Sequence, residues 1–161
     1  MNYRAFKSIV NSRKDPVALE TASESFFVQA TRISPYIEPN LSKIEFPSEK
    51  PPLILVTAMG ASGKTTTALA LSFDTGLPVL DLARHKPVGD NTLTGILTSA
   101  YPIESVGPVL EGLRAGTHGI IIDGIDEARS KTSEQAFAAF LDDRIERCRS
   151  APRATILVFG R

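Results

Sequence analysis

The stretch Leu53-Ile-Leu-Val-Thr-Ala-Met-Gly-Ala-Ser-Gly-Lys-Thr-Thr-Thr67 decides the fold of this 161-residue chain. Its apolar start runs into a glycine-rich turn, and helix-forming residues then follow from Lys64 until Gly76 ends them. A strand aimed at a helix N-terminus brings backbone N–H groups and the positive end of the helix dipole to one point, where anions bind. The stretch therefore predicts a strand, a phosphate-binding turn and a helix.

The turn matches the pattern G-x-x-x-x-G-K-[ST], except that Ala58 stands in the place of the first glycine. In that pattern Lys64 supplies a charge for the β and γ phosphates, and the Thr65 hydroxyl is a ligand for Mg²⁺. We expect ATP with Mg²⁺ to bind through Ala58, Gly60, Ala61, Ser62, Gly63, Lys64, Thr65 and Thr66. The other interpretation is a glycine turn that binds nothing, but the flanking strand and helix patterns favour phosphate binding.

A second motif, Gly119-Ile-Ile-Ile-Asp-Gly-Ile-Asp-Glu-Ala128, predicts a buried strand that ends in acid. Asp123 falls at the carboxyl end of this strand, where open α/β sheets bind ligands, and it would hold the magnesium ion through water. Asp126 and Glu127 follow within reach of a water that attacks the γ phosphate, and either acid could act as the catalytic base. Alternatively, they cap and charge the N-terminus of a helix expected near residues 130–148.

Together, A-M-G-A-S-G-K-T and D-G-I-D-E-A resemble the NACHT group of STAND NTPases, which are signal-transducing ATPases of innate immune and antiphage systems. In that group a small residue follows the metal-binding Asp and the acids come slightly later, as Gly124, Asp126 and Glu127 do here. The stretch Ala154-Thr-Ile-Leu-Val-Phe-Gly-Arg161 is similar to the next strand of the family, although Phe159-Gly160 replaces the usual Thr-Ser. The resemblance covers residues 50–161 and implies that Arg161 faces the γ phosphate.

The resemblance also implies a cytoplasmic switch that binds and hydrolyses ATP, with Asp126, Glu127 and Arg161 as catalytic residues and nucleotide-controlled self-association as its output in defence. It implies that the strand ending at Arg161 lies between the phosphate-loop strand and the acidic strand. Family members continue with a helical lid and a sensor, so we expect this stretch to be the first part of a nucleotide-binding domain. Its expected partners are ATP or ADP and either another copy or the remaining domains of a longer chain, and slow hydrolysis is expected without the lid.

Strands and helices are predicted to alternate after the first helix. Leu77-Pro-Val-Leu-Asp-Leu82 predicts a second strand, and helices are expected at residues 92–100 and from Ile103 to Leu113, with Gly116 as a stop. Alternation of this kind produces right-handed parallel crossovers. The predicted fold is a three-layer α/β P-loop NTPase of the additional-strand type with a parallel sheet.

We expect the chain to consist of two regions. Residues 1–50 form an N-terminal arm and linker, and residues 51–161 form a nucleotide-binding domain. Residues 1–15 are basic and polar, which is typical of a solvated or frayed arm. Asp15-Pro16 predicts the start of a helix that continues to Ile33, and five prolines between residues 35 and 52 predict an extended connector.

Composition points to no other partner. Basic and acidic residues are equal at 18 each, so no overall charge indicates a nucleic acid or a membrane surface. The single Cys148 excludes an internal disulfide, and neither a membrane-spanning run nor a signal peptide is apparent. We expect a cytosolic protein.

Other function classes stay open. A small-molecule kinase would use the same phosphate loop and place acceptor-binding groups after the second strand, where Asp81, Arg84 and Lys86 stand. A GTPase is disfavoured because no N-K-x-D motif follows the loop. A scaffold that binds nucleotide without hydrolysing it is the third possibility.

Overall fold

The computed structural model describes residues 1–11, 32–42, 53–84, 92–100, 102–148 and 156–161. The helix predicted to begin at Asp15-Pro16 lies outside this part except for its last residues, which are not helical. Lys86 and much of the proline-rich connector also lie outside it. No helix in the described ranges is long and apolar enough to cross a membrane.

Four parallel strands form one sheet with the order β1-β4-β3-β2. The strands are β1 (Leu53–Thr57), β2 (Val79–Asp81), β3 (Ile120–Asp123) and β4 (Ile156–Gly160). Thr57 pairs with Gly160 and Asp81 pairs with Asp123, so the carboxyl ends of the strands meet at one edge of the sheet. The expected place of β4, between the strand of the phosphate loop and the acidic strand, is confirmed.

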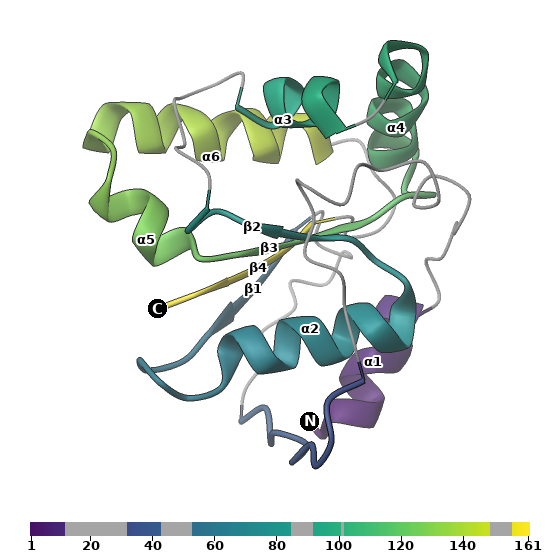
Figure 1. The fold of residues 1–161 in the computed structure, drawn as a ribbon, viewed down its shortest axis with the longest axis vertical. Coiled ribbons are helices and arrows are strands. Elements are labelled where there is room, and N and C mark those ends of the chain that lie inside the picture. The colour runs from purple at the N-terminus through teal and green to yellow at the C-terminus, as the bar shows by residue number, and fades with distance from the viewer. Residues whose placement is uncertain (12–31, 43–52, 85–91, 101, 149–155) are drawn as a thin grey trace.

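Helices cover both faces of the sheet (Figure 1). α1 (Tyr3–Asn11) and α2 (Lys64–Thr75) lie on one face, while α3 (Thr92–Ala100), α4 (Ile103–Ala115) and α6 (Glu134–Cys148) lie on the other. The short α5 (Ile125–Ser130) follows β3 directly and contacts β4. The predicted α/β class with a parallel sheet is confirmed.

Side chains of the central strands alternate between two apolar cores. Ile121 and Leu157 pack in the core beneath α1 and α2, whereas Ile122 and Val158 pack in the core beneath α3, α4 and α6. Strands that are buried on both faces need apolar residues at consecutive positions. That requirement explains the uninterrupted runs Ile-Ile-Ile in β3 and Ile-Leu-Val-Phe in β4.

Glycines bound α2 at both ends. Gly63, with φ 84°, precedes it, and Gly76, with φ 73°, ends it and donates its N–H to the Ser72 carbonyl at 2.7 Å. Both residues occupy the left-handed region that glycine adopts without steric cost. The predicted stop at Gly76 is therefore confirmed, and Gly116 ends α4 in the same way.

The structure divides the helix expected near residues 130–148 into α5 and α6. Ser133 causes the restart, because its hydroxyl accepts the N–H of Ala136 at 3.2 Å and so caps α6. Asp126 and Glu127 consequently lie in the first turn of α5 and do not cap the longer helix. The second strand is also shorter than predicted, since it begins at Val79.

The basic N-terminus is a helix that contributes to the core, which corrects the expectation of a frayed arm. Tyr3, Phe6 and Val10 are buried at spacings of three and four residues, and they share a core with α2 and the sheet. Lys7 and the Tyr3 hydroxyl both bond Asp74 near the end of α2, at 3.0 and 3.3 Å. The helix is thereby fastened to α2.

Replacing Phe6 with alanine should destabilise the protein by about 3–5 kcal/mol, because the side chain is fully buried and leaves a cavity. Arg4→Ala on the same helix is the matched control and should cost less than about 0.5 kcal/mol, since that side chain is 83% exposed. Urea unfolding measures both values. Equal stabilities of Phe6→Ala and the wild type would show that α1 does not pack as described.

Candidate functional site

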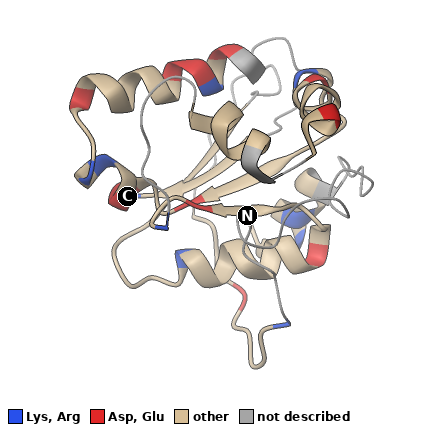
Figure 2. Cartoon of the chain, turned by 45° about the horizontal axis from the view of Figure 1, so that its top comes forward, with Lys and Arg blue, Asp and Glu red and all other residues tan. Residues whose placement is uncertain are grey.

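A cavity of about 450 Å³ opens where the carboxyl ends of β2, β3 and β4 meet the N-terminus of α2. Four segments line it: Gly60, Ala61, Ser62, Gly63, Lys64 and Thr65; Asp81 and Ala83; Asp123, Gly124, Asp126 and Glu127; Phe159 and Arg161. In Figure 2, basic segments (blue) and acidic segments (red) both lie near the C-terminus, on the side where this cavity opens. Of the predicted site residues, all except Ala58 and Thr66 line this cavity.

The turn between β1 and α2 leaves the helix N-terminus without a side-chain cap. Gly63 occupies the N-cap position and forms no side-chain hydrogen bond there, so the first N–H groups of α2 lack an acceptor from the cap. The Ala58 N–H, which donates to the Gly160 carbonyl at 3.1 Å, fixes the start of the turn to β4. These N–H groups and the helix dipole make this end of the cavity suitable for an anion.

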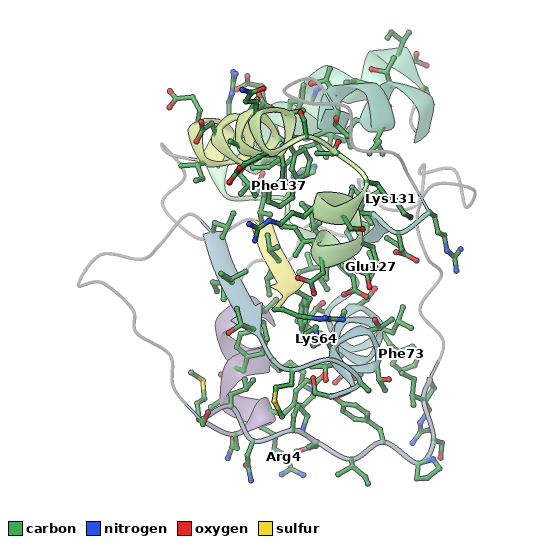
Figure 3. All side chains as sticks on the ribbon, turned by 90° about the vertical axis from the view of Figure 1, so that its left-hand side faces the viewer. Arg4, Lys64, Phe73, Glu127, Lys131 and Phe137 are labelled. Carbon is green, nitrogen blue, oxygen red and sulfur yellow. The ribbon has the colours of Figure 1, made fainter. Side chains whose placement is uncertain are left out.

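Lys64 lies across the turn that it ends. Its Nζ donates hydrogen bonds to the carbonyls of Ala58 and Met59, each at 3.0 Å. Figure 3 shows Lys64 and Glu127 near one another at the same edge of the sheet. An ammonium group has three donors, so Lys64 can bond an anion in the turn while keeping bonds to the loop.

Asp123, the predicted metal-binding acid, lies at the end of β3 and is only 5% exposed. Burial raises the pKa of its carboxyl group, while hydrogen bonds from the Thr65 hydroxyl and the Gly124 N–H lower it. The nearby carboxylates of Asp81 and Glu127 raise the pKa further. A divalent cation would stabilise the ionised form of Asp123 in this acidic setting.

The two predicted metal ligands, Thr65 and Asp123, lie close enough together for the Thr65 hydroxyl to lower the pKa of the Asp123 carboxyl group. Within the described ranges, no group of three or more His, Cys, Asp or Glu residues is arranged to hold a metal ion. Magnesium usually keeps several waters and binds through one or two protein groups together with phosphate oxygens. Thr65 and Asp123 fit that kind of shared site.

Asp126 and Glu127 differ in their contacts, although both line the cavity. The carboxylate of Asp126 accepts the backbone N–H of Arg161 at 3.0 Å, and its other oxygen lies 3.6 Å from the Arg161 Nε. The Glu127 carboxylate forms no hydrogen bond or ion pair with the described part of the chain. As negative charges in the first turn, both acids stabilise α5 by interacting with the helix dipole. Neither of them caps the helix through a side-chain hydrogen bond.

Arg161 lies over the turn after β1. A Cβ placed on Gly60 would be 3.4 Å from a guanidinium nitrogen of Arg161. A Cβ on the neighbouring Gly160 would overlap Ile125, so glycine at this position lets α5 pack against the end of β4. This packing supplies a structural reason for Gly160.

Asp81 also lines this cavity, although its place in the sequence suggested only an acceptor-binding group of a kinase. Its carboxylate accepts the Ala83 N–H at 2.9 Å and pairs with Arg84 at 3.1 Å. Its position opposite Asp123 in the sheet brings it to the cavity. Asp81 and Asp123 both lie at the end of a strand, and this shared position could have identified Asp81 as a site residue from the sequence.

A second cavity, of about 510 Å³, runs along β1 on another side of Lys64. The N-terminal part of the chain contributes Phe6, Pro39, Asn40, Leu41 and Ser42 to its wall. Ser62, Lys64 and Phe159 line both cavities. No local sequence pattern marks this wall, because contacts between distant segments form it.

No protein-family model and no curated protein matches the chain.

Asp123→Asn should raise the melting temperature at neutral pH, because the wild-type carboxylate is buried in charged form. The folded-state pKa is raised, so the favourable contribution of protonated Asp123 is complete below its unfolded pKa of about 3.9 and is lost as pH rises through the folded pKa. The stability advantage of the asparagine variant should thus grow as the pH increases over this window. Thermal unfolding measured at several pH values tests this.

The matched control is Glu111→Gln on α4, whose exposed carboxylate pairs with Arg114 at the surface. Its melting temperature should stay close to that of the wild type. A lower melting temperature for Asp123→Asn than for this control at neutral pH would contradict the expected cost of burying the charge.

Proposed function

We propose that this chain binds magnesium ATP and hydrolyses it, with the fold of a P-loop NTPase of the additional-strand type. One observation carries the proposal: Lys64, Asp123 and Arg161 come from three separate segments and line the same cavity. The sequence motifs predict a different role for each of them in binding or cleaving a triphosphate. A glycine turn with no ligand would not require these groups to meet.

Each group has a chemical task in the proposed complex. The N–H groups at the start of α2 and the Lys64 ammonium bind the β and γ phosphates. Thr65 and Asp123 would hold the magnesium ion, which would neutralise negative charge on the phosphates. Arg161 then neutralises charge that develops on the γ phosphate during cleavage.

The cavity along β1 offers a place for the rest of the nucleotide. It adjoins the phosphate turn at Ser62 and Lys64, whereas Asp123 and Glu127 line the other cavity. A triphosphate with its γ phosphate toward the acids extends its nucleoside toward β1. Apolar groups such as Leu55 and Leu41, with Asn40 among them, suit the face and polar edge of a base.

We assign the chain to the NACHT type of STAND switch on the resemblance of its motifs. Gly124 directly after the metal-binding acid, with Asp126 and Glu127 following, supports this assignment over other ATPases. The proposal includes exchange of ADP for ATP, self-association or docking on further domains of a longer chain, and a cytoplasmic role in defence signalling. A binding-only switch remains within the same proposal if turnover is very slow.

A small-molecule kinase is the second candidate, because Asp81 lines the cavity and Arg84 lies beside it. In a kinase these groups would bind the phosphate acceptor. Here Asp81 and Arg84 are already engaged with one another and with the turn after β2. Production of ADP without inorganic phosphate, once a candidate acceptor is added, would favour the kinase.

Lys64→Ala should abolish binding of magnesium ATP, since a charge and its hydrogen bonds to two phosphates disappear together. Arg114→Ala is the matched control, because it removes one positive charge from an exposed pair on α4 away from the cavity. Calorimetric titration with ATP and Mg²⁺ measures both affinities. Binding by Lys64→Ala at the wild-type affinity would refute the phosphate site, and tighter binding of GTP than of ATP would refute the choice of base.

A further inference from the structure

Two acids of α5, Asp126 and Glu127, follow the proposed metal ligand Asp123. The sequence does not distinguish their roles. Both Asp126 and Glu127 line the cavity. A catalytic base needs an ionised oxygen that is free to accept a proton from water. The existing partners of each carboxylate therefore discriminate between them.

Both oxygens of Asp126 are directed toward Arg161. Oδ1 accepts the Arg161 N–H at 3.0 Å, and Oδ2 lies 3.6 Å from the Arg161 Nε. These contacts join residues that are 35 positions apart. Asp126 thus connects the start of α5 to the residue that follows β4.

The backbone around this contact is fixed by close packing. A side chain on Gly160 would overlap Ile125, so the first turn of α5 lies directly against the end of β4. The turn closes with a hydrogen bond from the Ala128 N–H to the Gly124 carbonyl at 3.0 Å. Asp126 consequently has little freedom to move away from Arg161.

The hydrogen bond to the Arg161 backbone is the stronger of the two contacts. The ion pair is long, and 66% of the Arg161 side chain is exposed, so solvent screens it. A carboxylate that accepts a backbone N–H at 3.0 Å instead fixes the backbone of Arg161, the residue after β4. The position of this backbone limits where the guanidinium can lie relative to Gly60.

We propose that Asp126 is a positioning residue, which holds Arg161 over the phosphate turn, and that Glu127 is the acid that serves the attacking water. This assignment depends on the proposed ATPase function. Glu127 reaches the same cavity, and its carboxylate has no hydrogen-bonding partner in the described part of the chain. Glu127 accepts the proton of the water as it attacks the γ phosphorus, and the bond from that phosphorus to the bridging oxygen of ADP breaks.

Amide substitutions separate the two roles. Asparagine keeps an oxygen that accepts the Arg161 N–H, but neither asparagine nor glutamine can take a proton from water. Single-turnover hydrolysis of bound ATP by the whole chain should therefore fall by less than about fivefold in Asp126→Asn, where only the exposed ion pair is lost. Glu127→Gln should reduce the rate by about 10²- to 10⁴-fold.

Removing the acceptor altogether should have a larger effect on the same step. Asp126→Ala should slow hydrolysis by on the order of 10²-fold, because Arg161 loses its position. Arg161→Ala should have a similar effect, and the double variant should be no slower than Arg161→Ala alone, since Asp126 acts through this arginine. Equal losses in Asp126→Asn and Glu127→Gln, or fully additive losses in the double variant, would overturn the assignment.

The ratio of ATP to ADP affinity gives a readout that does not require turnover. Contact between Arg161 and the γ phosphate contributes to this ratio, so Asp126→Ala and Arg161→Ala should lower it equally, while Asp126→Asn and Glu127→Gln should preserve it. A ratio that falls in Arg161→Ala but stays at the wild-type value in Asp126→Ala would refute positioning by Asp126. Absence of ATP binding by the wild type would refute the proposed function itself, and circular dichroism identifies any variant that fails to fold.

Discussion

The insertion of β4 between β1 and β3 is the constraint on which the candidate site depends. Neighbouring strands lie about 4.8 Å apart, so this order brings the ends of β1, β4 and β3 within about 10 Å of one another. Lys64, Arg161 and Asp123 follow or end these strands. Close packing of Gly160 on Ile125 then brings α5 and its acids to the same edge.

The site combines groups that are costly to the folded chain. Asp123 is buried beside two other acids, and an uncapped helix N-terminus faces the same cavity. Each feature opposes stability in the free protein, and the ligand that we propose, a nucleoside triphosphate with magnesium, would offset this cost. The surrounding structure supports them with two apolar cores, and α1 adds Phe6 to the core beneath α2. The packing of the sheet and its helices therefore offsets the cost of the buried acid and the uncapped helix.

Local patterns were sufficient to predict the strand, turn and helix from Leu53 to Gly76, the acidic strand and the parallel sheet. The family resemblance supplied the place of β4. By contrast, the helix at the N-terminus was not predicted. Tyr3, Phe6 and Val10 have helical spacing, but the basic residues around them suggested a solvated arm. The contact between Asp126 and Arg161 had no local signal, because it depends on how closely α5 approaches β4. Tertiary packing thus separates two neighbouring acids that sequence treats as equivalent.

Hydrogen exchange of the wild-type chain with and without magnesium ATP tests the central claim most directly, because it locates the ligand on the backbone. If the N-terminus of α2 and the acidic segment form one triphosphate site, exchange should slow at residues 60–67 and 124–127 together, and ATP without Mg²⁺ should protect the second segment less. Protection that appears elsewhere, or at residues 60–67 with no change at 124–127 under either condition, would contradict a shared site.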